Sequence, residues 1–283
     1  MNFALIGAGK FGKNYDRLLK EIPGVSLKAI VTASSGNLET VLQDPEINCV
    51  VIATPPATHF EIAKTALEAG KHVLLEKPMV LSVQEAEELK KVVGKSGRVF
   101  MVGFQYLFNG YIQYLKKEIE NGAFGEIKKI SSEHFQSPPR NDVNAFWDAA
   151  PHPLSIFQYY FEPTKILNVE VETATREFTS VKVRFDRAPL LSIKTSWPGE
   201  KKVRKLILEG EKQTAILDET LEKQKLRFSS GLVPNIEADE PLRNEVEHFL
   251  DCIQNQKTPL TDVNFGCLNT KWLEIISENL TLL

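Results

Sequence analysis

The first 105 residues alternate short apolar runs with amphipathic segments, and this alternation restricts the fold more than any other feature of the chain. The apolar runs resemble strands buried on both faces of a parallel sheet, at 3–6, 27–31, 49–53, 73–75 and 99–102. Helical patterns lie between them, at 11–20, 58–69 and 83–93. Strands that alternate with helices of this length predict an α/β, doubly wound Rossmann domain.

The second part of the chain has a different pattern. A helical segment at 107–120 is closed by Asn121-Gly122, which is typical of a helix end. Strand patterns follow, at 126–136, 166–176, 179–186, 190–197, 203–209, 214–218 and 221–228. Several alternate polar with apolar residues, as an antiparallel sheet with two unlike faces does. Two helical patterns, 241–254 and 264–280, end the chain. We therefore expect two domains, 1–121 and 122–283, the second an α+β domain with an open, mostly antiparallel sheet.

Charge and composition restrict the partners. The chain has 34 basic and 37 acidic residues and a net charge of -3, which gives no electrostatic basis for binding nucleic acid or an anionic membrane. No apolar run approaches the roughly 20 residues that span a bilayer, and the start of the chain has a strand pattern rather than that of a signal peptide. Cys49, Cys252 and Cys267 lack the spacing of metal ligands, so we expect no metal and reduced thiols in a cytoplasmic protein.

A glycine loop, defined here as residues 7–12, follows the first predicted strand. In G-x-G-x-x-G, Gly7 permits a tight turn, Gly9 lets backbone approach a pyrophosphate, and Gly12 lets helix and strand pack closely. The amides at the start of the following helix favour the same anion. A purely structural turn is the alternative, but the strand before and the helix after favour a site for NAD or NADP.

The end of the second strand affects the choice of cofactor. Residues 32–36 contain no Asp or Glu to bind the adenosine ribose, as NAD enzymes usually have. Ser34, Ser35 and Asn37 could donate hydrogen bonds to a 2′-phosphate, although no arginine is present. The sequence therefore leans slightly to NADP. The alternative is a loop that contacts the adenosine through its backbone and accepts either cofactor.

Three segments together resemble the Gfo/Idh/MocA oxidoreductase family, whose members resemble glucose–fructose oxidoreductase and inositol dehydrogenase. They are the glycine loop, residues 53–59 (Ala-Thr-Pro-Pro-Ala-Thr-His), and residues 70–78 with their Glu76-Lys77-Pro78 ending. Residues 122–126 resemble the family's domain junction, so the resemblance runs along the full chain. It implies hydride transfer between a nicotinamide and a carbinol or keto carbon of a sugar, cyclitol or nucleotide-sugar.

The resemblance also implies catalytic residues. Lys77 would orient the substrate and stabilise the charge that develops on its oxygen, and the peptide before Pro78 is a candidate cis bond. Asp148 and His152 match the family's Asp-x-x-x-His spacing. His152 would be the acid/base, assisted by Asp148. From the residues alone, Asp148 could instead be an N-cap and His152 a packed residue at a helix start.

Further contacts follow from the same comparison. The expected cofactor-binding residues are Gly7, Gly9, Lys10, Phe11, Gly12, Thr32, Ser34, Ser35, Thr54, Pro55, His59, Glu76 and Lys77. The expected substrate-binding residues are Gln105, Arg140, Trp147 and His152. Arg140 could bind a carboxylate or phosphate, and a solvated loop arginine is an equal alternative. His72, His134 and His248 belong to no motif.

The chain departs from the family pattern on the substrate side. The family often has Asp at Ser155, Gly at Ala150, and Arg-Phe-x-Pro at residues 107–110. Two other functions therefore stay open: a reductase of the same fold acting on an imine or a tetrapyrrole, as biliverdin reductase does, and a non-catalytic NAD(P)-binding sensor. The open sheet needs cover on its exposed face, which predicts a homodimer or homotetramer through that sheet.

Overall fold

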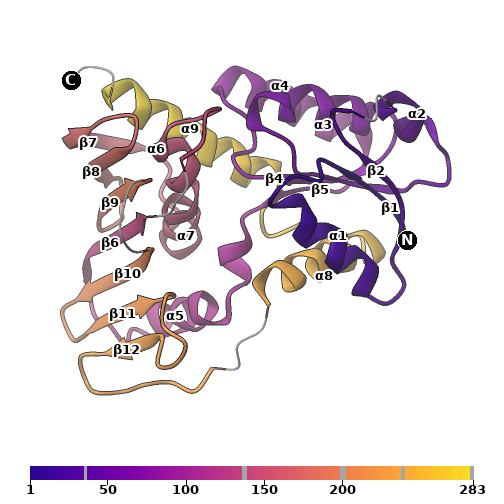
Figure 1. Cartoon of the computed structure of the whole chain (residues 1–283). Coiled ribbons are helices and arrows are strands. Elements are labelled where there is room, and N and C mark those ends of the chain that lie inside the picture. Colours follow the sequence, from indigo (N-terminus) through magenta and orange to yellow (C-terminus); the bar gives the residue numbers. More distant parts are fainter. Residues whose placement is uncertain (35–36, 136–138, 198–201, 237–239, 281–283) are drawn as a thin grey trace. The chain divides into compact units, whose positions relative to one another are not determined.

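The computed structural model forms two compact units, which Figure 1 shows coloured along the chain. The first contains residues 1–104 and 242–271, and the second contains residues 105–241 and 272–283. The structure describes residues 1–34, 37–135, 139–197, 202–236 and 240–280. The sequence-based division assigns cofactor binding to residues 1–121 and substrate binding to residues 122–283. This assignment of functions stays a prediction.

The first unit is built on a five-stranded sheet with the order β2-β1-β3-β4-β5. All neighbouring strands in it are parallel. The strands are β1 (Asn2–Ile6), β2 (Ser26–Val31), β3 (Cys49–Ile52), β4 (His72–Glu76) and β5 (Phe100–Gly103). All five predicted strands are confirmed. Four of them are buried on both faces as expected, but β2 alternates exposed with half-buried residues, so the expectation of burial on both faces is wrong for that strand.

Helices cover both faces of this sheet. They are α1 (Gly12–Glu21), α2 (Leu38–Gln43), α3 (His59–Glu68), α4 (Val83–Ser96), α8 (Pro241–Gln254) and the first part of α9 (Val263–Leu280). Figure 1 shows α3 and α4 on one face and α1 and α8 on the other, so the predicted doubly wound arrangement is confirmed. Phe249 of α8 packs edge-on against Phe3 of β1, with ring centroids 6.3 Å apart, and both rings are fully buried. The C-terminal helix α8 is thus part of the core of the first unit.

The second unit contains a seven-stranded sheet with the order β12-β11-β10-β6-β9-β8-β7. The strands are β6 (Ile127–Phe135), β7 (Ile166–Ala174), β8 (Phe178–Phe185), β9 (Leu190–Ser196), β10 (Val203–Gly210), β11 (Thr214–Asp218) and β12 (Leu226–Phe228). β6 and β9 pair in parallel, and every other neighbouring pair is antiparallel. The predicted mostly antiparallel sheet is therefore confirmed.

Two of the predicted elements have a clearly different extent in the structure. The strand predicted at 221–228 begins only at Leu226, because the Asp218 carboxylate binds both the amide and the hydroxyl of Thr220 and turns the chain. The helical segment at 107–120 is divided into a short 3-10 turn at Gln105–Phe108 and the helix α5 (Gly110–Glu120). Asn109 causes the division, since its side chain accepts a hydrogen bond from the Tyr111 amide and caps α5.

Helices α5, α6 (Ala145–Ala149) and α7 (Pro151–Phe161) lie against one face of the seven-stranded sheet (Figure 1). Ile130, Ser132 and His134 of β6 are buried on that face, and their neighbours in the strand point the other way. Pro151 occupies the first position of α7, where its missing amide hydrogen costs no helical hydrogen bond.

Two further observations concern the whole described chain. Across the described ranges, no helix combines the length and the apolar character that crossing a bilayer requires. Cys49, Cys252 and Cys267 are free thiols, and all three are buried.

Candidate active site

Three loops leave the first sheet along one edge. Ile6, Ile52 and Leu75 are aligned across the parallel strands β1, β3 and β4, so the carboxyl ends of these strands lie side by side. The loop after β1 is the glycine loop, the loop after β3 contains Thr54, and the turn after β4 contains Lys77. The strand order reverses between β1 and β3, which is where open α/β sheets bind their ligands.

The glycine loop has the shape that a pyrophosphate requires. Gly7 has φ of 96°, and a Cβ added there would lie 2.5 Å from the carbonyl oxygen of Ala53. A Cβ at Gly12 would overlap the carbonyl oxygen of Gly7. A Cβ at Gly9 would meet no atom within 4 Å. Gly7 and Gly12 are therefore required by the fold itself, whereas the open space at Gly9 fits the close approach of a dinucleotide.

The start of α1 is suited to an anion. Phe11 occupies its N-cap position and makes no side-chain cap hydrogen bond, and the first turn contains no acidic residue. The positive end of the helix is thus not compensated by a carboxylate of its own first turn. Lys10 is exposed beside it, and the Phe11 ring packs edge-on against Tyr15 with centroids 5.8 Å apart.

The loop after β2 contributes hydroxyl groups. The Thr32 and Ser34 hydroxyl oxygens lie 3.0 Å apart, and Ser34 is exposed. Ser35, the third predicted contact of this loop, lies outside the described residues. These groups could donate hydrogen bonds to a ribose or to a phosphate, so the geometry here is compatible with either cofactor.

His59 connects two of the loops. Its ring is fully buried, with Nδ1 2.8 Å from the Pro78 carbonyl oxygen and Nε2 3.0 Å from the Thr54 carbonyl oxygen. The side chain thus holds the loop after β3 against the turn after β4. Pro55, between these groups in sequence, is exposed. The cofactor contacts of His59, Thr54 and Pro55 stay predictions.

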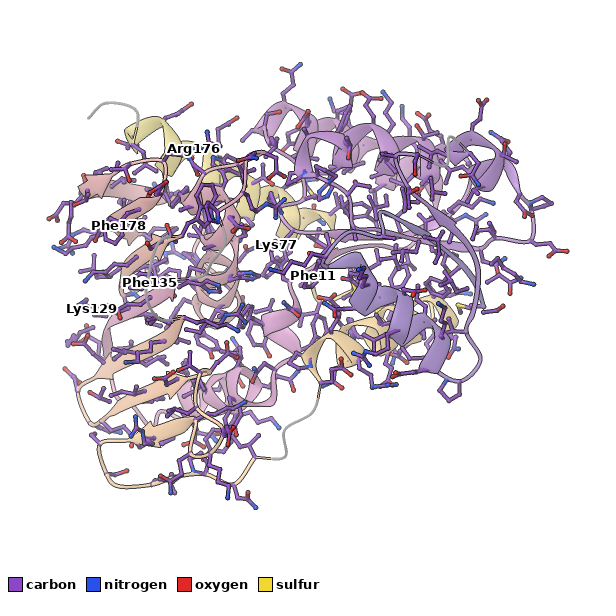
Figure 2. All side chains as sticks on the ribbon, in the orientation of Figure 1. Phe11, Lys77, Lys129, Phe135, Arg176 and Phe178 are labelled. Carbon is purple, nitrogen blue, oxygen red and sulfur yellow. The ribbon has the colours of Figure 1, made fainter. Side chains whose placement is uncertain are left out.

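The Glu76-Lys77-Pro78 turn follows β4 directly, and its Lys77–Pro78 peptide bond is cis, as the sequence suggested. Glu76 is buried and Lys77, labelled in Figure 2, is half-buried. Oε2 of Glu76 accepts a hydrogen bond from the Lys77 amide at 3.1 Å, and Oε1 accepts one from the Tyr15 hydroxyl at 2.6 Å. The Tyr15 hydroxyl oxygen also lies 3.0 Å from Oε1 of Glu245.

Sequence reasoning missed Tyr15 and Glu245. They come from α1 and α8 and are 230 positions apart, so no local spacing connects them to Glu76. An acidic residue within an otherwise apolar helical face, as Glu245 is in α8, is the one feature that could have drawn attention to the position.

The second unit contains Asp148 and His152. Asp148 belongs to α6, and its carboxylate accepts a hydrogen bond from Nε1 of Trp197 at 3.0 Å and pairs with Arg140 at 3.4 Å. The N-cap position of α7 is Ala150 and has no side-chain cap hydrogen bond. The interpretation of Asp148 as an N-cap is therefore wrong, and its carboxylate is held by an indole and a guanidinium instead.

His152 lies in the first turn of α7 and is buried. Its ring stacks on His134, with centroids 5.2 Å apart and an interplanar angle of 18°. The Tyr106 ring meets it edge-on at 4.6 Å, and the Arg204 guanidinium lies 5.9 Å from the centre of that tyrosine ring. His134, for which the sequence offered no partner, thus belongs to an aromatic group around His152.

A small cavity of about 30 Å³ adjoins these rings, and its lining includes His134, His152, Arg204 and Glu219. That volume is room for about one or two water molecules. Burial raises the pKa of Glu219, which also accepts a hydrogen bond from the Asn109 side-chain amide at 2.7 Å. The register of the strands could have suggested that Arg204 lies near His134, because the two residues face each other across the β10–β6 pair.

The remaining substrate-side candidates differ in their surroundings. Arg140 forms a two-point ion pair with Asp142, at 2.9 and 2.6 Å, in addition to its contact with Asp148. The hydrogen bond to Asp142 is the largest cause that raises the pKa of Arg140. Trp147 is half-exposed, and Gln105 is a half-buried residue at the start of the 3-10 turn before α5. Among the hydrogen bonds of the described residues, the one that joins these three candidates to a predicted catalytic residue runs from Arg140 to Asp148.

Two departures from the family pattern have a clear place in the second unit. Ser155 is fully buried, and its hydroxyl donates a hydrogen bond to the His152 carbonyl oxygen at 2.8 Å. Leu107 is fully buried as well. Ser155 thus fixes the backbone of His152, while Leu107 fills core.

A parallel sheet with an open glycine loop at its switch point, followed by a unit with an open sheet, is typical of two-domain dinucleotide-binding proteins. Residues 1–104 match the model of Gfo/Idh/MocA, an oxidoreductase family with an NAD-binding Rossmann fold. Over these residues the chain is similar to the members of that family.

Similar proteins extend the comparison beyond the first unit. The scyllo-inositol 2-dehydrogenase (NAD(+)) of Bacillus subtilis (strain 168) is 25% identical over 307 aligned positions, covering 92% of this chain and 89% of that protein. The uncharacterized oxidoreductase YrbE of the same organism is 29% identical over 177 residues, covering 55% of this chain and 52% of YrbE. A solved protein of Magnetospirillum magnetotacticum MS-1 superposes with a TM-score of 0.85 at 26% identity, covering 97% of this chain and 98% of that one. The chain covers 52%, 47% and 37% of the length of the first three curated relatives it matches.

Proposed function

We propose that the chain is an NAD(P)-dependent oxidoreductase that transfers a hydride between the nicotinamide and a carbinol or keto carbon of a sugar, cyclitol or nucleotide-sugar. The observation that carries this proposal is the open space at Gly9, at the edge of the sheet from which the Lys77 turn also leaves. The full-length similarity to a scyllo-inositol dehydrogenase supports the substrate class.

The glycine loop and the start of α1 would hold the cofactor pyrophosphate, and bound NAD(P) would supply the hydride acceptor in one direction and the donor in the other. Lys77 would donate a hydrogen bond to the reacting oxygen and stabilise its negative charge. His152 would accept the hydroxyl proton during oxidation and return it during reduction. Asp148, whose carboxylate is held by Trp197, would assist His152.

Turnover on a panel of sugars and cyclitols with either cofactor tests this assignment. We expect Lys77→Met and His152→Ala each to lower kcat on the order of 10²-fold or more. Lys91→Met, an exposed lysine of α4, is the matched control and should keep the activity of the unmodified chain. Unchanged kcat in both site variants would refute the assignment. Cofactor binding without turnover on any substrate would favour the sensor, and turnover on imines alone would favour the other reductase.

For the cofactor we propose a slight preference for NADP over NAD. The support is the exposed Ser34 hydroxyl at the end of β2 and the absence of an acidic residue from residues 32–36 of the sequence. Fluorescence titration with NADPH and NADH measures the ratio of the two Kd values. Tighter binding of NADH would contradict the preference.

We further propose that residues 1–121 bind the cofactor, and that residues 122–283 bind the substrate and form a cytoplasmic homodimer or homotetramer through the seven-stranded sheet. The face of that sheet turned away from α7 carries Phe135 and Phe178, both labelled in Figure 2, with ring centroids 6.4 Å apart. Both are aligned with Ser196, so they form one row across three strands. Half-buried rings on a sheet face that no helix of the described residues covers suit a self-complementary contact.

Light scattering after size-exclusion chromatography tests the assembly. The unmodified chain should elute as an oligomer and Phe178→Lys as a smaller species. Phe60→Lys, which changes a half-buried ring on α3, should leave the assembly unchanged. A monomeric unmodified chain at micromolar concentration would contradict this part of the proposal.

A further inference from the structure

A buried group of one phenol and two carboxyls lies beneath the Lys77 turn, and we name Tyr15, Glu76 and Glu245 the carboxyl cluster. The three side chains come from α1, β4 and α8. Tyr15 and Glu245 are 0% exposed and Glu76 is 7% exposed. Two carboxyl groups and a hydroxyl at hydrogen-bonding distance, removed from water, cannot all be in their ordinary ionisation states at neutral pH without a large energetic cost.

Counting hydrogens assigns a proton to this cluster. The Tyr15 hydroxyl has one hydrogen, yet its oxygen lies 2.6 Å from Glu76 Oε1 and 3.0 Å from Glu245 Oε1. Tyr15 can donate to only one of these oxygens. The other contact is a hydrogen bond only if that carboxyl carries a proton and donates it to the phenol oxygen.

The surroundings decide which carboxyl holds the proton. Glu76 accepts hydrogen bonds at both oxygens, from Tyr15 and from the Lys77 amide, as a carboxylate should. Glu245 Oε2 is buried and has no hydrogen-bond partner among the described residues. A negative charge there would be buried with half of its acceptors unused, so the proton belongs on Glu245. Burial, and next the charge of Glu76, raise the pKa of Glu245 well above its usual range, in agreement with this assignment.

Packing keeps the cluster in place. A Cβ added to Gly103 of β5 would lie 3.2 Å from Glu76 Oε1, 3.3 Å from the Tyr15 hydroxyl and 3.4 Å from Glu245 Oε1. The neighbouring charges of α8 are directed elsewhere, since Arg243 pairs with Glu21 at the surface and lies 3.9 Å from the exposed Glu247. The neighbouring charges that raise the pKa values of Tyr15 and Glu245 are therefore those of the cluster's own carboxyls.

We propose that Tyr15 and a protonated Glu245 are positioning residues for the Lys77 turn: Glu245 donates to Tyr15, Tyr15 donates to the Glu76 carboxylate, and that carboxylate holds the Lys77 amide. This chain of hydrogen bonds fixes the backbone of Lys77 at the start of the turn, and hence the position from which its side chain extends. Its catalytic consequence rests on the proposed function, whereas the proton on Glu245 does not.

Infrared difference spectroscopy tests the protonation without any substrate. The unmodified chain at pH 8 should show a carboxylic-acid carbonyl band that is absent from Glu245→Gln and present in Glu247→Gln, the matched control two residues further along α8. A spectrum with no such band, or a band that survives in Glu245→Gln, would overturn the protonation and with it the relay.

Kinetics test the positioning role. Tyr15→Phe should lower kcat on the order of 10–100-fold with the NADH Kd nearly unchanged, because a small displacement of a catalytic group has effects of that size. Glu245→Gln keeps a neutral donor to Tyr15, so it should retain more kcat than Glu245→Ala and should alter the pH profile of kcat above neutrality. Equal kcat and equal pH profiles in all these variants would overturn the positioning role. Failure of every substrate in the unmodified chain would instead refute the proposed function, while the infrared result still stands.

Discussion

Adding one methyl group at successive glycines of the glycine loop should separate folding from cofactor binding. At Gly7, alanine must adopt φ of 96°, which costs about 1–2 kcal/mol. Its Cβ also lies 2.5 Å from the Ala53 carbonyl oxygen, an overlap that costs about 1–3 kcal/mol. Gly7→Ala should therefore lower the free energy of unfolding by about 2–5 kcal/mol.

Gly9→Ala should behave in the opposite way. Its backbone is outside the left-handed region and its Cβ meets no atom within 4 Å, so the fold should be unchanged or gain about 0.4–1 kcal/mol from a stiffer unfolded chain. The same methyl group occupies the space proposed for the pyrophosphate. The NADH Kd should therefore rise at least about tenfold, which corresponds to about 1.4 kcal/mol.

Urea unfolding gives the stability of each variant, and NADH fluorescence gives its affinity. Gly94→Ala, which adds a Cβ in open space within α4, is the matched control and should gain about 0.5–1 kcal/mol without changing the NADH Kd. The reasoning is refuted if Gly9→Ala binds NADH as the unmodified chain does, or if Gly7→Ala is as stable as that chain.

Other variants test separate parts of the structure. Burial raises the pKa of Glu245, so its stabilising proton is fully present below the unfolded pKa and its contribution falls by about 1.4 kcal/mol per pH unit above it, up to the folded pKa. Urea unfolding across pH 5–9 should show this decline, and Glu245→Gln should remove it. Ser82→Ala removes the N-cap of α4 and should cost about 1 kcal/mol by the same assay. Trp197→Phe removes the indole hydrogen bond to Asp148 and should cost about 1–3 kcal/mol, with a fall in kcat. Burial raises the pKa of Cys49 to about 12, so a thiol reagent at pH 8 should label Cys49 only after unfolding. Rapid labelling of Cys49 in the folded chain would contradict its burial.

Four strands of the first unit could be predicted because burial on both faces makes each one a continuous apolar run, as at 49–52. The strand β2 gives a weaker pattern, since one of its faces is exposed and Lys28 interrupts its apolar residues. The helix α2 was missed, because six residues with two buried positions give too short a pattern. The strand expected at 221–228 was too long, since a turn built by the Asp218 side chain does not change the hydrophobic pattern.

The candidate site also has one part that the sequence predicts and one part that it does not. The glycine loop, Lys77 and the Asp148–His152 spacing are local motifs, and a single segment contains each of them. Glu245 reaches Glu76 from a helix near the other end of the chain, and His134 meets His152 only after β6 and α7 have packed together. Contacts between distant segments depend on tertiary packing, so local periodicity alone cannot predict them.

Transfer of deuterium from NADH or NADPH labelled at nicotinamide C4 tests the central claim most directly. Mass spectrometry of the product of a keto-sugar or keto-cyclitol should show one deuterium bound to carbon, from one face of the nicotinamide only. With Lys77→Met the labelled product should form more slowly, on the order of 10²-fold or more. Product formation without carbon-bound deuterium, or labelled product at an undiminished rate with Lys77→Met, would contradict hydride transfer at this site.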